Sequence, residues 1–381
     1  MKLLFVIDSL GSGGAQKQMV SMACGLKEKG HEVELFNYYP EHSFYRPMLE
    51  DANIKIIDFL GKKSGFSMMV VSKLIETLRK GKYDLALAYL NSPSLYLELS
   101  HLISPHAVKV VSERNSLRDY QKRGFLRHFH RFAKCVVVNS NRHCSDLVKE
   151  YPYLKAKLKI IYNGVNVTTF KPEPVRKKEK NEIKLLGVGR ISPQKNIINL
   201  IKSLDYFYQS NQWAPELNWI GRVEQNSKAG ISYWESVTKL LKTLPAKVHE
   251  KINFHGEQKN IQKWLTDSDA LISASYYEGL SNVICEALAC GKPVLASDVS
   301  DNKILIEHGS RGFLFQPELP ISIAEKIRKF TSLKPDRINL MSRNCRTFAE
   351  THLSEEKMVN SYETLFENLI ASEKSVESIK A

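Results

Sequence analysis

The alternation of strand-like and helix-like segments constrains this chain more than any other feature of its sequence. Short apolar runs recur at residues 3–7, 33–36, 54–57, 85–89, 108–112 and 135–139, and segments with helical periodicity lie between them. Strands that alternate with helices in this way indicate a parallel sheet with helices on both faces. The first part of the chain is therefore predicted to be a doubly wound α/β domain.

A polar, basic stretch interrupts this alternation at residues 168–182, and its core reads Lys171-Pro-Glu-Pro-Val-Arg-Lys-Lys-Glu-Lys180. This composition is typical of an interdomain linker. The alternation then restarts, with apolar runs at residues 185–188, 217–220, 252–255, 270–273 and 293–296. We predict two Rossmann-like, doubly wound domains that face a cleft.

The predicted domains are residues 1–168 and residues 169–360, followed by a C-terminal helix at 361–381 that packs back on the first domain. Helical periodicity starts at Glu355, and an apolar stripe covers one face of this tail. The stripe consists of Met358, Tyr362, Leu365 and Phe366.

The composition excludes several classes of protein. With 381 residues, 43% of them hydrophobic and 25% charged, the chain can bury two cores and is not disordered overall. No apolar run is long enough to span a bilayer, and Asp8 interrupts the apolar start, which we interpret as a first strand and not a signal peptide. The six cysteines form no C-x-x-C pair, so we expect reduced thiols and a cytoplasmic protein.

The formal net charge of +14 favours a polyanionic partner. Nucleic acid, an anionic membrane face and phosphate-bearing substrates all fit this charge, and so does a basic surface that only aids solubility. Charge alone does not choose among these alternatives.

A glycine-rich turn follows the first strand and reads Asp8-Ser-Leu-Gly-Ser-Gly-Gly-Ala-Gln16. Because it opens a helix, its amide groups can point at an anion, although the glycines could also serve only a tight turn. A nicotinamide fingerprint would require glycine where Gln16 stands, and a Walker A motif would require Gly-Lys-Ser/Thr. Neither pattern is present, which leaves contact with an acceptor or a phosphate as the functional alternative.

The second domain contains two sharper constellations. The first is Gly187-Val-Gly-Arg-Ile-Ser-Pro-Gln-Lys-Asn196, in which a strand ends at Gly189 and two cations, Arg190 and Lys195, follow five residues apart. Ligands of doubly wound sheets bind at the carboxyl ends of the strands. Both cations can therefore reach one phosphate cluster, the arginine as a bidentate fork and the lysine as a point charge.

The second constellation is Ser275-Tyr-Tyr-Glu-Gly-Leu-Ser-Asn-Val-Ile-Cys-Glu286, which carries two glutamates separated by seven residues. We predict a turn at 279–282 and a helix over 282–290, whose first amide groups would face a diphosphate. Glu278 precedes the turn, where it can bond sugar hydroxyls, and Glu286 lies among apolar neighbours, where a carboxylate needs a partner.

These segments resemble the retaining glycosyltransferases of family four, which have the GT-B fold. The resemblance covers nearly the whole chain. It rests on the order and spacing of the glycine-rich turn, Asn163-Gly-Val-Asn166, the Gly-Arg…Lys-Asn loop, the E-x7-E element, Gly291-Lys-Pro-Val294, Ser297-Asp298 and Glu307-His-Gly-Ser-Arg-Gly-Phe313.

The resemblance implies a hexosyltransferase that needs no metal or other cofactor. It would move a sugar from a nucleotide-diphosphate sugar, with a UDP-sugar favoured, to a lipid-linked or free saccharide acceptor. Arg190 and Lys195 would neutralise the diphosphate, Glu278 would bind the donor sugar, and Glu286 would bond the ribose. Arg190, Lys195 and Glu278 are the implied catalytic residues. The implied donor-binding set adds Gly189, Gly279, Leu280, Ser281, Asn282 and Glu286, and the acceptor-binding set is Gly13, Gly14, Gln16 and Arg114.

Three positions depart from the family pattern. Arg114 stands where many relatives carry histidine. An arginine cannot act as a base, but it can bind phosphate or acceptor oxygens. Ser300-Asp-Asn-Lys-Ile304 replaces the usual Gly-Gly-x-Pro-Glu and lacks its glutamate, and Gly221-Arg222-Val223 replaces Gly-Asp-Gly. A literal D-x-D occurs at Asp267-Ser-Asp269, but it precedes a predicted strand where a metal-binding motif of the other large transferase fold would follow one, so no metal site is expected.

Residues 117–134 carry aromatic residues at helical spacing between arginines and a lysine, and residues 62–70 add further basic and apolar side chains. A core-packed helix with a basic outer face explains this pattern, and so does a surface that sits on an anionic leaflet. In the second case the enzyme is peripheral on the cytoplasmic face of the inner membrane. It would then act on a lipid-linked saccharide in surface polysaccharide or lipopolysaccharide assembly.

Two other functions remain open at the level of sequence. A sugar-nucleotide epimerase on the same fold would convert its nucleotide sugar without an acceptor. A non-catalytic basic module would bind nucleic acid, but the chain contains no recognisable nucleic-acid motif, so no nucleic-acid partner is expected.

Overall fold

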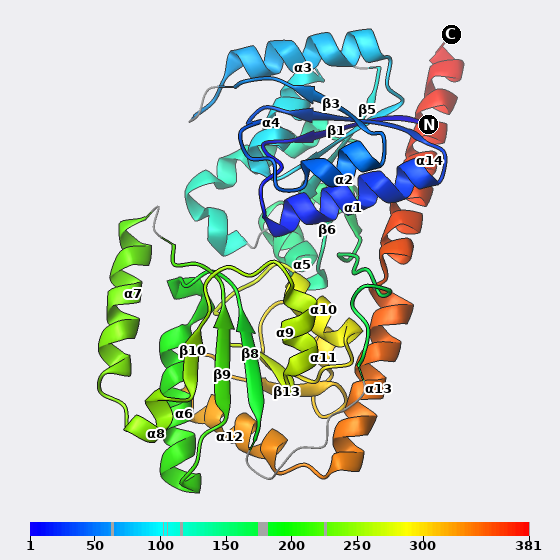
Figure 1. Cartoon of the computed structure of the whole chain (residues 1–381). Coiled ribbons are helices and arrows are strands. Elements are labelled where there is room, and N and C mark those ends of the chain that lie inside the picture. Colours follow the sequence, from blue (N-terminus) through cyan, green and yellow to red (C-terminus); the bar gives the residue numbers. More distant parts are fainter. Residues whose placement is uncertain are drawn as a thin grey trace. The chain divides into compact units, whose positions relative to one another are not determined.

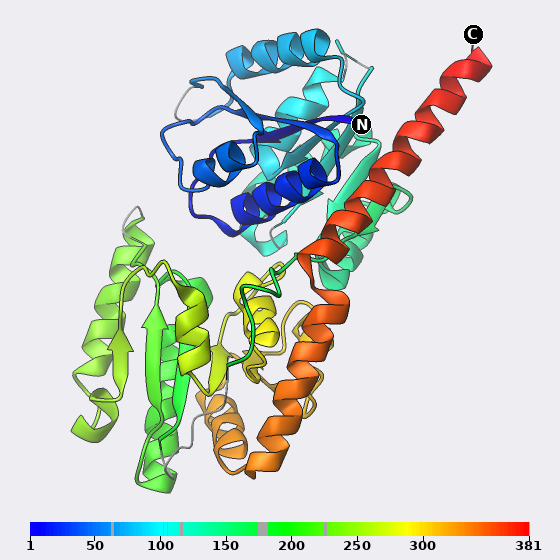
Figure 2. The same ribbon diagram turned by 45° about the vertical axis from the view of Figure 1, so that its right-hand side comes forward.

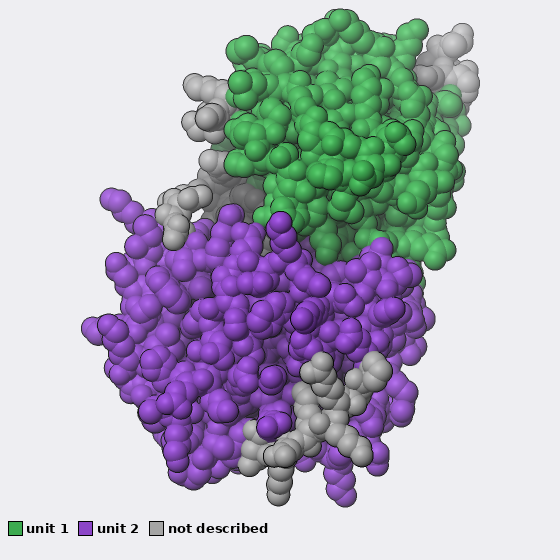
Figure 3. Space-filling model, viewed as in Figure 1, with its two compact units in different colours: residues 1–164, 355–381 green, residues 165–354 purple. Residues whose placement is uncertain are grey.

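The computed structural model describes residues 1–61, 65–101, 103–104, 106–114, 117–173, 182–224 and 227–380, and the side chains among them except those of 117–123 and 376–380. The chain forms two compact units (Figure 3): unit 1 is Met1–Gly164 with Glu355–Ala381, and unit 2 is Val165–Ser354. The boundaries thus fall after Gly164 and Ser354, where the sequence placed them after residues 168 and 360. Residues 174–181 of the predicted linker lie outside the described part.

Unit 1 is built on a seven-stranded parallel sheet with the order β3-β2-β1-β4-β5-β6-β7 (Figure 1). Its strands are β1 (Lys2–Ile7), β2 (Glu32–Asn37), β3 (Lys55–Asp58), β4 (Leu85–Tyr89), β5 (Val108–Glu113), β6 (Cys135–Val138) and β7 (Leu158–Ile160). Six of them match predicted strands. The seventh, β7, was missed because it spans only three residues, two of which are exposed.

Helices cover both faces of this sheet, and alternate residues of β1 show how. Leu3, Phe5 and Ile7 belong to a core with helices α1 (Gly14–Glu28), α2 (Arg46–Asp51) and α14 (Glu355–Lys380). Leu4 and Val6 belong to the opposite core, with α3 (Met68–Gly81), α4 (Asn91–Ser100) and α5 (Asn141–Glu150). Strands buried on both faces explain why the apolar runs of the sequence do not alternate with polar residues.

The C-terminal helix α14 packs on the α1 side of the sheet (Figure 2). Tyr362 and Phe366 are completely buried, and Met358 lies in the same core. The contact with α1 is close, since a Cβ atom at Gly25 would lie 2.6 Å from Cγ2 of Val359. The predicted apolar stripe of the tail is therefore part of the core of unit 1.

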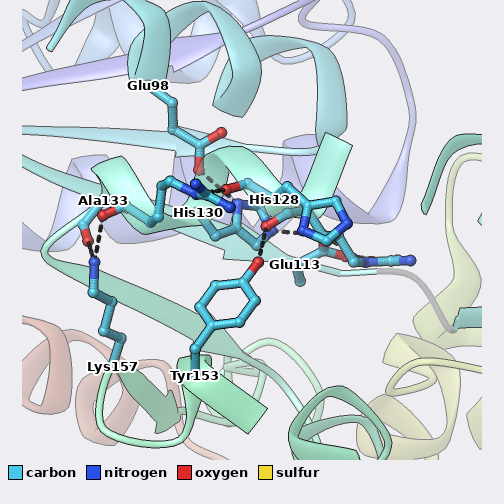
Figure 4. A network of polar contacts seen from close by, with 9 residues as sticks. Glu98, Glu113, His128, His130, Ala133, Tyr153 and Lys157 are labelled. Atoms are coloured by element: carbon cyan, nitrogen blue, oxygen red, sulfur yellow. Dashed lines mark hydrogen bonds and ion pairs between the residues drawn. The ribbon is translucent and has the colours of Figure 1, made fainter. Parts of the chain in front are cut away.

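A network of buried charged side chains holds the 3₁₀ helix η1 (Leu117–Phe132) against the sheet of unit 1 (Figure 4). His130 contacts Glu98 of α4 at 2.5 Å and Glu113 of β5 at 3.0 Å, and Arg127 pairs with Glu113 at 3.1 Å. Burial lowers the pKa of His130, but the two carboxylates outweigh this effect and raise it to about 10. Burial raises the pKa of Glu113, yet the hydrogen bond from His130, the nearby imidazole of His143 at 3.6 Å and the charge of Arg127 hold it well below its usual range.

Unit 2 has a six-stranded parallel sheet with the order β10-β9-β8-β11-β12-β13 (Figure 1). The strands are β8 (Lys184–Val188), β9 (Glu216–Ile220), β10 (Ile252–Phe254), β11 (Ala270–Ser273), β12 (Val294–Ser297) and β13 (Gly312–Phe315). The sequence missed β13, where Gly312 adopts φ +154° and lies so close to β12 that a Cβ atom would be 1.8 Å from the Val294 carbonyl oxygen.

The helices of unit 2 alternate with these strands, so both units have the predicted doubly wound fold. They are η3 (Pro193–Lys195), α6 (Ile197–Asn211), α7 (Lys228–Leu241), α8 (Ala246–His249), α9 (Ile261–Asp267), α10 (Asn282–Ala289), α11 (Asn302–Ile306), α12 (Pro320–Thr331) and α13 (Pro335–His352). Because β11 lies between β8 and β12, the loops that follow these three strands are neighbours at the carboxyl edge of the sheet.

Candidate active site

The loop after β8 brings a lysine side chain across the backbone of a glycine. Gly189 adopts φ +147°, and a Cβ atom there would lie 2.8 Å from Cε of Lys195. The carbonyl oxygen of Gly189 accepts a hydrogen bond of 2.9 Å from the indole of Trp219, which fixes the loop to β9. A side chain at position 189 would thus displace Lys195, which explains the glycine.

Lys195 forms an ion pair with Glu278, with 2.5 Å between Nζ and Oε1. Their side chains are 18% and 12% exposed, so the pair is partly withdrawn from solvent but still accessible. The residues come from the loops after β8 and β11, which the sheet order makes adjacent. Two of the three predicted catalytic residues are therefore in direct contact.

Further hydrogen bonds tie these two loops together. The backbone amide of Tyr276 donates to the carbonyl oxygen of Gln194, and the side chain of Gln194 donates to the carbonyl oxygen of Tyr277, each at 2.9 Å. On the other side, the hydroxyl of Ser300 in the loop after β12 donates to the carbonyl oxygen of Gly279. The segment 276–279 is thus held by both neighbouring loops.

Arg190 does not contact this pair but forms an ion pair with Glu224 at 3.1 Å, and its side chain is 56% exposed. The two predicted phosphate-binding cations therefore have different carboxylate partners. The exposure of Arg190 leaves its guanidinium group able to change partner at little cost, since an exposed ion pair contributes at most about 1 kcal/mol.

Helix α10 begins immediately after this segment, at Asn282, with Ser281 as an N-cap residue that makes no side-chain capping hydrogen bond. Leu280 and Ser281 are buried, so the turn 279–282 is packed and not a free loop. Glu286 lies one turn into the helix and is 7% exposed, which agrees with its predicted place beside a packed surface. The positive end of the helix dipole and the cation of Lys195 both act on the carboxyl edge of this sheet.

The glycine-rich turn of unit 1 has exposed backbone at Gly13 and Gly14. The side chain of Gln16 folds back over Gly13, where a Cβ atom would lie 2.2 Å from its Oε1, and its Nε2 donates to Asp8 at 3.2 Å. Burial raises the pKa of Asp8, although hydrogen bonds from Ser9 and Gln16 oppose this. The turn is therefore ordered by Asp8 and still presents glycine backbone to its surroundings.

Arg114, also a predicted acceptor residue, is buried in unit 1. It is only 7% exposed, and its guanidinium group donates to Oδ1 of Asn163 at 2.7 Å and to the hydroxyls of Tyr89 and, at 2.6 Å, Tyr362. It also stacks over the ring of Tyr89, 4.0 Å from the centroid. This arginine links the sheet to α14, and its geometry favours a structural role over contact with an acceptor.

Two family models match the chain over most of its length. One is described as glycosyltransferase family 4 and matches residues 12–169, and the other is described as glycosyl transferases group 1 and matches residues 169–347. The chain belongs to glycosyltransferase family 4. It is thus an enzyme of the hexosyltransferase class, and the resemblance seen in the sequence is confirmed.

Individual relatives of this glycosyltransferase are distant but match more than nine-tenths of its length. It is 24% identical to spore coat protein SA of Bacillus subtilis over 93% of this chain and 95% of that protein. It is 23% identical to an alpha-1,4-N-acetyl-D-galactosaminyltransferase of Campylobacter jejuni, whose name specifies a saccharide on PP-undecaprenol, over 93% and 97% of the two chains. The structure of HepE from Anabaena in complex with UDP superposes with a TM-score of 0.81 at 20% identity, covering 97% and 100%, which establishes the GT-B fold.

Two sequence features of this glycosyltransferase remain: Arg222, which departs from the family pattern, and the D-x-D motif. Arg222 is mostly exposed and lies 3.9 Å from Glu257. In the D-x-D motif, Asp267 ends α9 and Asp269 accepts a hydrogen bond of 2.7 Å from the backbone amide of Lys184, so this carboxylate helps to fix β8. Among the residues that the structure describes, no group of three or more His, Cys, Asp or Glu side chains could hold a metal ion.

Sequence reasoning missed three residues of this glycosyltransferase's candidate site: Gln194, Glu224 and Ser300. No local motif marks Gln194 or Glu224, because the residues that they contact lie far along the chain. Ser300 could have been identified, since a serine at a position where the family pattern has glycine is a visible departure from that pattern. Within the described part of the chain, no helix is long and apolar enough to cross a membrane.

Proposed function

We propose that this glycosyltransferase transfers a hexosyl group from a UDP-sugar to a lipid-linked saccharide, with retention of configuration and without a metal ion. The contact between Lys195 and Glu278, beside the first turn of α10, carries the proposal. A cation, a carboxylate and a helix N-terminus at one edge of a parallel sheet match the diphosphate and the sugar of such a donor.

Each side chain has a distinct task in this proposal. Lys195 exchanges part of its contact with Glu278 for the diphosphate, and Arg190 leaves Glu224 to add a bidentate contact. Glu278 keeps only part of its contact with Lys195 and accepts hydrogen bonds from hydroxyls of the donor sugar. Glu286 accepts hydrogen bonds from the ribose. Backbone groups of Gly189 and of residues 279–282 complete the donor site.

The cations also explain how the bond to the sugar breaks. Negative charge develops on the diphosphate as it leaves, and Lys195 and Arg190 are placed to stabilise that charge. The acceptor hydroxyl attacks the same face of the sugar, and the departing phosphate takes its proton. Positioning and charge stabilisation are then the main sources of rate enhancement.

The comparisons support the choice of substrates. HepE is described in complex with UDP, and the Campylobacter jejuni relative is named for a saccharide on PP-undecaprenol. We therefore infer a uridine nucleotide as donor and a polyprenyl-diphosphate-linked saccharide as acceptor, as in the assembly of a surface polysaccharide. In unit 1, the exposed backbone of Gly13 and Gly14 and the side chain of Gln16 are the proposed acceptor contacts.

Calorimetric titration with UDP, GDP and ADP, each with magnesium and with EDTA, tests the donor site. We expect UDP to bind with the same affinity in both buffers. A strict requirement for magnesium would contradict the metal-independent mechanism, and binding by none of the nucleotides would remove the donor site.

A turnover assay tests the chemistry. Glu278→Ala should lose most of its activity while staying folded, whereas Glu325→Ala, a matched change on the exposed face of α12, should behave like the wild type. NMR of the product should show the anomeric configuration of the donor. An inverted product, or full activity of Glu278→Ala, would refute the proposed mechanism.

Exposed apolar side chains in unit 1 support attachment to an anionic membrane surface. Met68 and Met69 open α3 with 67% and 70% of their surfaces exposed, and Leu60 and Phe66 nearby are also exposed. Single exposed apolar residues are common, but a group of them in a chain of net charge +14 fits a lipid surface. Lys62, Lys63 and Ser64 of the predicted membrane segment lie outside the described residues.

Sedimentation with vesicles of phosphatidylglycerol and phosphatidylcholine tests this attachment. Replacing Met68 and Met69 with serine should reduce the bound fraction severalfold. Ile231→Ser, which removes an exposed apolar side chain from α7 of unit 2, serves as the control and should bind like the wild type. Equal binding of all three proteins would exclude this surface.

A further inference from the structure

The segment 276–279 is the point at which three loops of unit 2 meet. On the β8 side it is held by Gln194 and Lys195. Of these two, Lys195 belongs to the Gly-Arg…Lys-Asn pattern of the family. On the β12 side it is held by the hydroxyl of Ser300, which donates to the carbonyl oxygen of Gly279. The pattern that this sequence resembles has glycine at position 300, and glycine has no hydroxyl with which to make this second contact.

Ser300 makes this contact from an unfavourable backbone conformation. Its φ angle is +50°, in the left-handed region where residues other than glycine are strained. Glycine would remove the strain but also the hydroxyl. The adjacent turn is itself fixed, because the side chain of Asn302 donates to the carbonyl oxygen of Ser297 at 2.9 Å. The hydroxyl of Ser300 is therefore presented from a rigid support.

The orientation of the Gly279 carbonyl group affects the residues after it in the chain. A trans peptide unit is planar, so fixing the carbonyl of Gly279 also fixes the orientation of the amide group of the next residue. This peptide unit leads through Ser281 into α10, whose first turn is part of the proposed donor site. Glycine itself imposes little restriction on this peptide. The contact with Ser300 therefore adds a directional constraint to the packing of Leu280 and Ser281.

We propose that Ser300 is a positioning residue for the nucleotide-sugar donor: it holds the Gly279 peptide and thereby sets the geometry of the turn at the start of α10. The inference rests on the proposed donor site of unit 2. Ser300 touches no substrate in this role, and it acts through Gly279 and Glu278.

Two substitutions separate positioning from simple stabilisation. Ser300→Ala removes the hydroxyl and keeps the strained backbone, so its Tm should fall by about 2–4 °C. Ser300→Gly removes the hydroxyl and relieves the strain, so its Tm should stay close to that of the wild type. Both variants lose one hydrogen bond to the donor turn, and both should show a rise of about fivefold in KM for the donor.

The matched control is Gln212→Gly. Gln212 is another residue with positive φ (+61°), and it is the C-cap residue after α6, at the end of that helix far from the donor turn. This change relieves the same kind of strain, and it should leave KM for the donor unchanged. KM for the acceptor should be unchanged in all three variants.

The outcomes discriminate between the two roles. The positioning role would be overturned if the donor KM rose only in Ser300→Ala, the variant whose Tm falls, and stayed at the wild-type value in Ser300→Gly. A normal donor KM in both variants would do the same. If UDP binds and Glu278→Ala is inactive, but both Ser300 variants have a normal donor KM, only this inference fails. If UDP does not bind at all, the proposed donor site fails as well.

Discussion

Lys195 has the surroundings of a cation that exchanges partners. It lies against Gly189, contacts Glu278 at 2.5 Å and keeps part of its surface accessible. We expect Lys195→Ala to lower kcat/KM by about 10²–10³-fold, because the charge on the leaving diphosphate loses a preorganised cation. Initial rates at varied donor concentration measure this effect. Lys202→Ala, an exposed position on α6, is the control, and equal rates for both variants would contradict the role of Lys195.

The burial of Arg114 indicates that this arginine stabilises the fold. Arg114→Met leaves the hydroxyls of Tyr89 and Tyr362 and the side chain of Asn163 without their charged donor, and we expect it to lower the free energy of unfolding by about 3 kcal/mol. Urea denaturation measures the loss. Arg142→Met on α5, where the side chain is 68% exposed, should change stability by less than about 0.5 kcal/mol.

The same experiment separates the two roles of Arg114. Under conditions in which the Arg114→Met variant is folded, its KM for the acceptor should equal that of the wild type. A stable variant with a raised acceptor KM would instead support the acceptor contact that the sequence predicted.

At the scale of elements, η1 depends on a network that no single segment contains. His130 and Arg127 come from η1 itself, Glu98 from α4, Glu113 from β5 and His143 from α5. The sequence showed the basic residues of η1 but not their buried acidic partners. The core-packed interpretation of this segment placed its arginines on a basic outer face and its aromatic residues in the core. The structure corrects it, because Arg127 is buried and Phe125 is 63% exposed.

The network predicts a pH dependence with a defined sign. Because the pKa of His130 rises from its usual 6.5 to about 10 on folding, its contribution to stability is complete below pH 6.5 and declines as pH rises towards 10. We expect His130→Gln to cost about 3–5 kcal/mol at pH 6, and less as the pH approaches 10. Urea unfolding of both proteins from pH 6 to 10 measures the difference.

A difference that stays constant or grows with pH would contradict a charged His130. His249→Gln, an exposed position on α8, is the control and should match the wild type throughout this range.

Most strands were predictable because each is buried on both faces and reads as an apolar run. The two exceptions have physical reasons. β7 at the edge of its sheet exposes two of three residues. β13 is a buried apolar run, but it spans only four residues and begins with glycine, a residue that is depleted in strands. The Ser300 contact was also beyond the sequence, because the carbonyl that it binds lies 21 residues away in another loop.

At the scale of the whole molecule, each unit has its own core, so a donor that binds unit 2 should stabilise that unit. At one hundred times its Kd, UDP adds about 2.7 kcal/mol, which corresponds to a rise in Tm of about 5–10 °C. Differential scanning calorimetry with and without UDP measures this shift. We expect Lys195→Ala to lose most of it, and an equal shift in the variant would exclude Lys195 from the donor site.

The sequence by itself determined the two-domain parallel-sheet architecture, the family, and the loops in which the candidate donor site lies. These follow from local patterns: apolar runs set strands, and motif spacing places charged residues at strand ends. Tertiary structure decided the partners of those charges. In the folded chain Lys195 pairs with Glu278, Arg190 pairs with Glu224, Arg114 is buried against α14, and Ser300 contacts Gly279. Such contacts depend on which strands become neighbours in the sheet and on how helices far along the chain pack against it, and local sequence patterns do not determine either.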